Sequence, residues 1–85
     1  MSYKEIKLNK KSSEVILEVG EERQRQIDLG WTQTHDAVEG AGHIVREARI
    51  RLNRFGNNGE DLAKTYQRQL LIEAAALLVA AAEVL

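Results

Sequence analysis

The residue types best suited to recognition or chemistry gather in one stretch of this chain, residues 22–43. The single tryptophan and both histidines lie there, together with arginines, carboxylates and side-chain amides. The stability of a small helical domain does not require such clustering, because Leu, Ala and Val alone can fill its core. The stretch holds many hydrogen-bond donors and a flat aromatic ring but few nucleophiles. It therefore favours binding a ligand over transforming one.

A ligand with phosphate and aromatic groups suits these residue types. A guanidinium can bind a phosphate through two hydrogen bonds, and an indole ring offers a flat face on which a base can stack. We therefore predict a binding site for a small nucleotide-like anion, without catalytic residues. The residues expected to form this site are Arg23, Gln26, Trp31, Thr32, His35, Asp36, His43 and Arg46.

Arg23 and Glu73 are also candidates for a structural ion pair. Each lies in the middle of an apolar stripe of its expected helix, and a buried charge without a partner is too costly to persist. They are expected to pair with each other, or with Asp36 and Arg25. The two interpretations are compatible, because Glu73 can orient Arg23 toward a ligand.

The other site candidates have structural alternatives as well. Trp31 follows a helix-ending glycine and can close the turn between two helices as a hydrophobic plug. Asp36 suits a helix N-cap better than the orienting carboxylate of a His35 general base, because adjacent side chains seldom face each other. His43 and Arg46 share a polar helix face of the kind that is usually solvated. Two histidines without i,i+4 spacing do not form a zinc motif, so no metal or cofactor is predicted.

Hydrophobic periodicity predicts an all-α chain that forms one domain. Ser13 suits the N-cap of the first helix, and Gly30 suits the left-handed residue that ends it. The second helix is expected to begin at a capping box and to end in a turn at residues 56–59. The domain, 1–85, divides into a polar arm (1–12) and helices over 13–29, 36–55 and 60–85, which make a helical hairpin plus a long Ala-rich C-terminal helix.

Composition limits the kinds of partner. The formal net charge is −1 and cysteine is absent, which argues against a general polyanion binder and against a disulfide framework. The basic run between Arg46 and Arg54 is interrupted by Glu47 and contains no aromatic residue, so nucleic-acid binding is not expected. Residues 2–13 are rich in Lys and Glu rather than apolar, so we expect no signal peptide and a cytoplasmic location.

The C-terminal helix is expected to be a subunit interface. Residues 70–85 are apolar apart from Glu73 and Glu83, but this run is shorter than the roughly 20 residues that a membrane span needs. Its many alanines allow close approach of neighbouring helices on more than one side. Three helices of one chain leave much of this surface uncovered, so we predict a homo-oligomer that forms through residues 60–85, most simply about a two-fold axis.

The order of motifs along residues 18–45 is distinctive. It runs Glu22-Arg23-Gln24-Arg25-Gln26-Ile27, then Gly30-Trp31-Thr32, then His35-Asp36. This block resembles one that recurs in small bacteriophage-encoded proteins, which are sometimes grouped with the MazG-like all-helical nucleotide pyrophosphohydrolases. The block often continues with a second His and a Gly-Glu-Leu, where this chain has Glu39 and Gly42-His43-Ile44.

The resemblance implies a helical nucleotide pocket. MazG-like enzymes bind magnesium through a Glu-x-x-Glu pair and a later Glu-x-x-Asp pair. Here Glu18 and Glu21 match the first pair, but no Glu-x-x-Asp follows them. Two-metal chemistry is hard to assemble from half of this set, so a binding protein is favoured and a magnesium-dependent pyrophosphohydrolase is the alternative.

In size and expected assembly the chain is similar to the small phage proteins that sequester nucleotide messengers. Those proteins hold the cyclic nucleotides or ADP-ribose derivatives by which bacterial defence systems such as Thoeris and CBASS signal infection. The similarity implies sequestration of such a signal, without cleavage, in the cytoplasm of an infected bacterium. A third interpretation is a phage protein that binds a host protein through its arginine-rich face.

Overall fold

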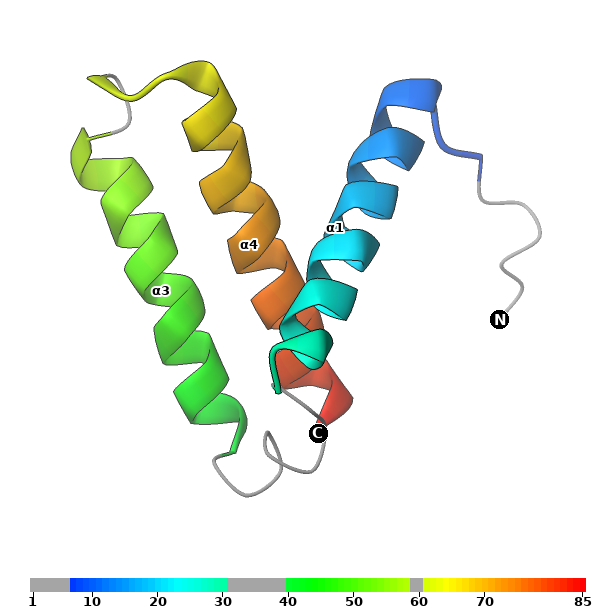
Figure 1. The fold of residues 1–85 in the computed structure, drawn as a ribbon, viewed down its shortest axis with the longest axis vertical. Helices are drawn as coiled ribbons and strands as arrows, with labels where there is room; N and C mark the ends of the chain where they lie inside the picture. The colour runs from blue at the N-terminus through cyan, green and yellow to red at the C-terminus, as the bar shows by residue number, and fades with distance from the viewer. Residues whose placement is uncertain (1–6, 31–39, 59–60) are drawn as a thin grey trace.

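A computed structural model describes residues 7–30, 40–58 and 61–85 of the chain. Within these residues the fold contains three helices and no strands, which confirms the expected all-α class. The helices are α1 (Lys10–Asp28), α3 (Ala41–Asn58) and α4 (Lys64–Glu83). In Figure 1, α3 runs antiparallel to α4, while α1 lies against α4 on the other side and diverges from it toward its own N-terminus.

The first helix begins one residue after Asn9, so the prediction that Ser13 caps it is wrong. The side chain of Asn9 accepts a hydrogen bond of 2.7 Å from the backbone N–H of Ser12. Asn and Ser serve equally well as N-caps. Asn9 is the cap here because residues 10–12 are already helical. The helix ends at Asp28, and Gly30 follows two residues later in the left-handed conformation expected of it, with a φ of 102°.

The two other helices differ in length from their expected ranges. The expected start of the second helix at residue 36 lies outside the described residues, and α3 is described from Ala41 onward. At its other end α3 continues through Gly56 and Asn57 to Asn58, where a turn was predicted. One glycine costs a helix only about 1 kcal/mol, which is too little to end it. The third helix starts at Lys64 rather than at residue 60.

The core lies between α3 and α4. Ile44, Leu70 and Leu77 are its largest fully buried side chains. Small residues let the two helices approach closely, and those in the packed cluster are each at most 5% exposed: Ala48, Ala74, Ala80 and Ala81. The helix α4 is therefore covered on more than one side within a single chain, as its alanine content suggests. Neither α1 nor α3 nor α4 is long and apolar enough to cross a membrane.

Leu77→Ala should destabilise the protein by about 2–5 kcal/mol, because it leaves a cavity in the packed centre of the core. Urea denaturation followed by circular dichroism measures this change. Leu17→Ala is the matched control, since Leu17 is 65% exposed on α1, and it should change stability by at most about 0.5 kcal/mol. Equal losses for the two variants would contradict this assignment of the core.

Candidate functional site

The contact between α1 and α4 is built from polar side chains. The buried residues of α1 are Glu22, Arg23 and Gln26, which are 7%, 5% and 4% exposed. The apolar residues Ile16 and Leu17 of the same helix are instead 55% and 65% exposed. Charged residues are seldom buried unless they are paired. The partners of these three side chains therefore determine what this contact can do.

Arg23 pairs with Glu83 near the C-terminal end of α4. Its Nε and Nη2 atoms donate to the same carboxylate oxygen of Glu83, at 3.2 and 2.7 Å. The expectation that Arg23 has a structural ion pair is thus confirmed, but the expected partner Glu73 is wrong. Glu83 lies ten residues beyond Glu73 on α4, and at about 100° per residue the two carboxylates project from different faces of the helix.

Glu73 takes part in a second ion pair, between α4 and α3. Its carboxylate accepts hydrogen bonds from Arg51 Nε at 3.0 Å and from Gln69 Nε2 at 2.9 Å. Arg51 also donates to the backbone oxygen of Glu47, at 3.0 Å. Glu73 therefore ties α4 to α3, while Glu83 ties it to α1.

Glu22 is the centre of the polar contact. Arg25 donates to both of its carboxylate oxygens, at 2.8 and 2.7 Å, and Gln26 Nε2 donates at 3.2 Å. The hydrogen bonds from Arg25 lower the pKa of the Glu22 carboxyl below its ordinary value of 4.5, although burial opposes them. The charge of Arg51 on α3 acts in the same direction as Arg25. Hydrogen bonding to Glu22 in turn raises the pKa of the Arg25 guanidinium.

One buried polar atom of Gln26 has no partner within residues 7–30, 40–58 and 61–85. Its Oε1 has no hydrogen-bond partner among the described residues, although the side chain is almost fully buried.

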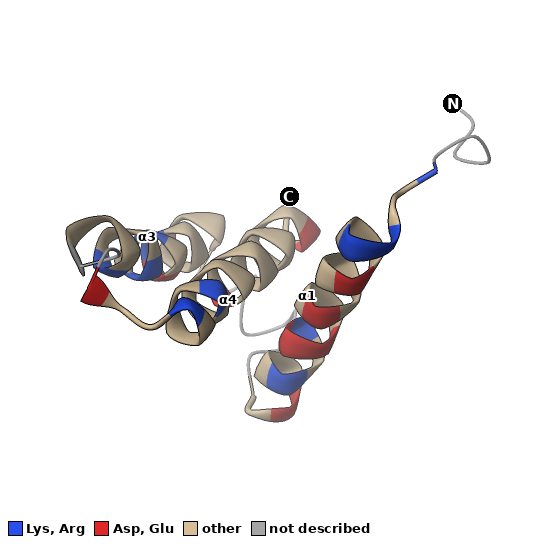
Figure 2. Ribbon diagram, turned by 90° about the horizontal axis from the view of Figure 1, so that it is seen from above, with Lys and Arg blue, Asp and Glu red and all other residues tan. Residues whose placement is uncertain are grey.

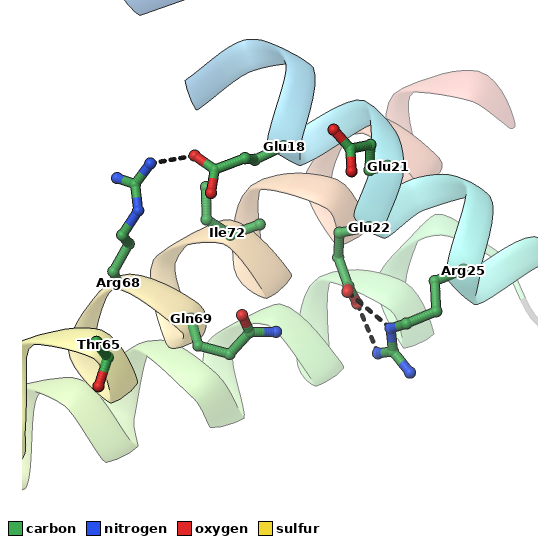
Figure 3. A pocket seen from close by; sticks show the side chains of 8 residues that line it. All are labelled: Glu18, Glu21, Glu22, Arg25, Thr65, Arg68, Gln69 and Ile72. Atoms are coloured by element: carbon green, nitrogen blue, oxygen red, sulfur yellow. Dashed lines mark hydrogen bonds and ion pairs between the residues drawn. The ribbon is translucent and has the colours of Figure 1, made fainter. Parts of the chain in front are cut away.

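A cavity of about 480 Å³ opens beside Glu22, between α1 and α4 (Figure 3). In this view, one side carries the ion pair of Arg68 with Glu18 and the other side carries the ion pair of Arg25 with Glu22. The complete lining combines carboxylates, guanidiniums, an amide, a hydroxyl and one aliphatic side chain: Glu18, Glu21, Glu22, Arg25, Thr65, Arg68, Gln69 and Ile72.

The cavity offers both donors and acceptors to a ligand. Arg25 and Arg68 are about half exposed, at 55% and 48% of their side chains. Within the described part of the chain, Nη1 of Arg25 and both Nε and Nη1 of Arg68 donate no hydrogen bond. These guanidiniums are held in place by carboxylates yet keep N–H groups for an anion. Glu21 and the carbonyl oxygen of Gln69 supply acceptors for hydroxyl or amino groups.

The structure places only some of the predicted site residues together. Arg23 and Gln26 lie in the polar contact, and Gln26 reaches the cavity wall through its bond to Glu22. His43 is half-buried and Arg46 is exposed on α3, and no described contact joins either to Arg23 or Gln26. The remaining predicted residues lie outside the described residues: Trp31, Thr32, His35 and Asp36.

Most cavity residues were missed in the sequence, although a signal for them exists. On α1 they are residues 18, 21, 22 and 25, and on α4 they are residues 65, 68, 69 and 72. Each set has the i, i+3, i+4, i+7 spacing of one helix face. The α1 set is wholly polar, and the α4 set is polar apart from Ile72. Two such faces predict a polar contact only if the two helices are known to be neighbours.

The two glutamates that match the magnesium pair of MazG-like enzymes both line this cavity. The carboxylate of Glu18, however, is bonded to Arg68. Across residues 7–30, 40–58 and 61–85, no three His, Cys, Asp or Glu side chains are arranged to hold a metal ion.

No protein-family model matches this chain, and no curated protein or solved structure is similar to it. The resemblance of residues 18–45 to phage proteins and MazG-like enzymes therefore stays a prediction. The function has to be argued from the cavity and the polar contact.

The stability of the protein should fall as the pH drops through the acidic range. A carboxyl whose pKa is lowered by folding stabilises the folded state above its unfolded pKa, and this contribution disappears as the pH falls through the folded value. For Glu22 the loss begins near its ordinary value of 4.5 and continues below it. Urea titrations between pH 7 and pH 3 should show a smaller acid loss for Glu22→Gln than for the wild type. Glu14→Gln, at an exposed position of α1, should retain the wild-type profile.

A double-mutant cycle tests the pair of Arg23 with Glu83. Arg23→Met should destabilise the protein because it leaves the Glu83 carboxylate without this partner, and Glu83→Leu in the same chain should restore part of the loss, with a coupling of about 0.5–3 kcal/mol. The control cycle combines Arg23→Met with Glu73→Leu and should be additive within about 0.5 kcal/mol. Coupling in the control cycle alone would contradict the observed pairing.

Proposed function

We propose that this protein binds a small nucleotide-derived signal, of the cyclic nucleotide or ADP-ribose type, and sequesters it without cleaving it. In this proposal the protein is phage-encoded, and holding the signal inhibits bacterial defence signalling. The observation that carries the proposal is the cavity between α1 and α4, in which ion-paired arginines face a ligand-sized space of about 480 Å³. Small-molecule sites have volumes of about 300–1,000 Å³.

The lining suits a nucleotide because it presents three kinds of group. The unused N–H groups of Arg25 and Arg68 suit phosphate oxygens, since guanidiniums bind phosphates in a planar fork. The acceptors of Glu21 and Gln69 suit ribose hydroxyls or a base amino group. Ile72 supplies an apolar surface for the sugar or base. A ligand with only phosphate would leave the acceptors unused, and a purely apolar ligand would leave the arginines unused.

The predicted site residues extend this cavity. Gln26 shares Glu22 with Arg25, and so helps to hold a carboxylate that lines the cavity. Arg23 directly follows Glu22 on α1. We propose that Trp31 and His35 contribute from the segment that follows α1, where a stacked base is expected to gain about 1–3 kcal/mol from the indole.

Sequestration is favoured over hydrolysis by the state of Glu18. For a magnesium ion to use Glu18 and Glu21 together, it has to compete with Arg68 for the Glu18 carboxylate. A ligand phosphate can instead accept hydrogen bonds from the Arg68 N–H groups that have no acceptor among the described residues, while Arg68 stays paired with Glu18.

The proposal includes assembly through residues 60–85 and a location in the bacterial cytoplasm.

Calorimetry with ADP-ribose and with cyclic mono- and dinucleotides tests the proposal. At least one of these should bind, and both Arg25→Gln and Arg68→Gln should weaken it by about tenfold or more, because a charge-assisted hydrogen bond contributes about 1.5–3 kcal/mol. Arg49→Gln is the matched control, since Arg49 is an exposed arginine of α3 that does not line the cavity, and it should bind as the wild type does.

The fate of the ligand separates sequestration from catalysis. After incubation with magnesium and heat denaturation, mass spectrometry should recover the bound nucleotide unchanged. Pyrophosphate release that is abolished by Glu18→Gln would establish the pyrophosphohydrolase alternative instead. Undiminished binding by both arginine variants would show that the ligand does not use this cavity.

A further inference from the structure

The charges that line the cavity between α1 and α4 have a definite order. Arg68 and Arg25 lie on opposite sides of the cavity, each bound to its own carboxylate, Glu18 or Glu22. Figure 3 shows the carboxylates of the lining between the two guanidiniums. Figure 2 shows the same order along α1, where a run of acidic positions precedes the arginines near the C-terminal end of the helix. The cavity is therefore positive at both ends and negative in the middle.

One phosphate does not serve both ends of this cavity. Glu18 and Glu22 are four residues apart on α1, which corresponds to a rise of about 6 Å along the helix axis. Each arginine approaches its carboxylate from the outer side (Figure 3), so the guanidiniums are further apart than the carboxylates. A phosphate that reached toward both arginines would lie midway between them, among the carboxylates, where like charges repel it. Anionic groups therefore fit only at the two ends.

Glu21 gives the middle of the cavity its net negative charge. Glu18 and Glu22 are each paired with an arginine, whereas Glu21 is exposed and has no ion pair with any described residue. A carboxylate repels a phosphate, but it accepts hydrogen bonds from hydroxyl and amino groups. The middle of the cavity therefore suits a part of the ligand that is uncharged and carries such donors.

We propose that the cavity preferentially binds a nucleotide whose two phosphates are held apart by its sugar, as in a cyclic dinucleotide or a nucleoside bisphosphate. One phosphate binds Nη1 of Arg25, and the other binds Nε and Nη1 of Arg68, which donate no hydrogen bond to any described residue. Hydroxyl or amino groups between the phosphates donate to Glu21. ADP-ribose has the opposite order, because its two phosphates are joined directly and lie between uncharged ends. The inference rests on the proposed function and names the class of nucleotide that fits the same site.

Two isomeric probes test the order of charges. Adenosine 3′,5′-bisphosphate and ADP contain the same atoms, but only the first has its phosphates on separate sugar hydroxyls. In calorimetry at constant ionic strength, the bisphosphate should bind at least about tenfold more tightly, because only it gives each arginine an anion. A cyclic dinucleotide should likewise bind more tightly than ADP-ribose. Equal affinities of the two isomers, or tighter binding of ADP, would overturn the inference.

Glu21→Gln tests the cause of this preference. The substitution removes the negative charge from the middle of the cavity but keeps the size of the side chain and one acceptor oxygen. It should strengthen the binding of ADP and reduce the preference for the bisphosphate by about threefold or more. Glu14→Gln is the matched control, since Glu14 is an exposed glutamate of α1 that does not line the cavity, and it should keep the wild-type preference. A preference that Glu21→Gln leaves unchanged would contradict the role given to this carboxylate.

Inorganic phosphate tests the two ends without a nucleotide. In NMR titrations that follow the side-chain Nε signals, phosphate should shift the signals of Arg25 and Arg68 with separate dissociation constants. Arg68→Gln should leave the response of Arg25 unchanged, and Arg25→Gln should leave that of Arg68 unchanged. A response of both signals that either variant abolishes, or no response at either arginine, would overturn the two-ended cavity. Two independent responses without binding of any nucleotide would support the two ends and refute the proposed function, so the two failures are distinguishable.

Discussion

The position of α1 depends on charged pairs rather than on an apolar stripe. Glu22, Arg23 and Gln26 are its buried residues, and two of them are charged. Removing water from such groups is expensive, and among the described residues the bonds of Arg25 and Gln26 to Glu22 and of Arg23 to Glu83 help to offset this cost. Hydrophobic contacts tolerate sliding, whereas ion pairs of this geometry exist in one register. The pairs of Arg23 with Glu83 and of Glu18 with Arg68 join α1 to α4, so they fix the register of these two helices and with it the shape of the cavity.

Ion pairs also explain why the arginines of the cavity are suited to an anion. Glu22 holds Arg25 and Glu18 holds Arg68, so each guanidinium is oriented before a ligand arrives. Pre-orientation lowers the entropy lost on binding. Each arginine donates only some of its five N–H groups to its carboxylate. The others have no hydrogen-bond acceptor among the described residues. An anion therefore completes the coordination of these arginines without breaking the pairs that hold α1 in place.

Sequence patterns predicted the helices but only part of the site. Periodicity located all three helical segments, and the cost of burying a charge correctly required a partner for Arg23. The identity of that partner depends on how α4 is rotated between its neighbours, and one sequence does not specify this rotation. The face at residues 65, 68, 69 and 72, which is polar apart from Ile72, was not predicted for the same reason. These residues are recognisable as part of a site only beside the matching face on α1, which lies about 40 residues or more away in the sequence.

The alanine-rich composition of α4 follows from its place between two unlike neighbours. Toward α3 it needs small residues for close packing, as Ala74 and Ala81 provide. Toward α1 it needs a carboxylate for Arg23, which Glu83 provides. Its third side carries leucines that no described part of the chain covers. A helix that meets only one neighbour has a single apolar stripe, whereas α4 has two unlike neighbours and an apolar third side, which together account for the nearly uniform apolarity of residues 70–85.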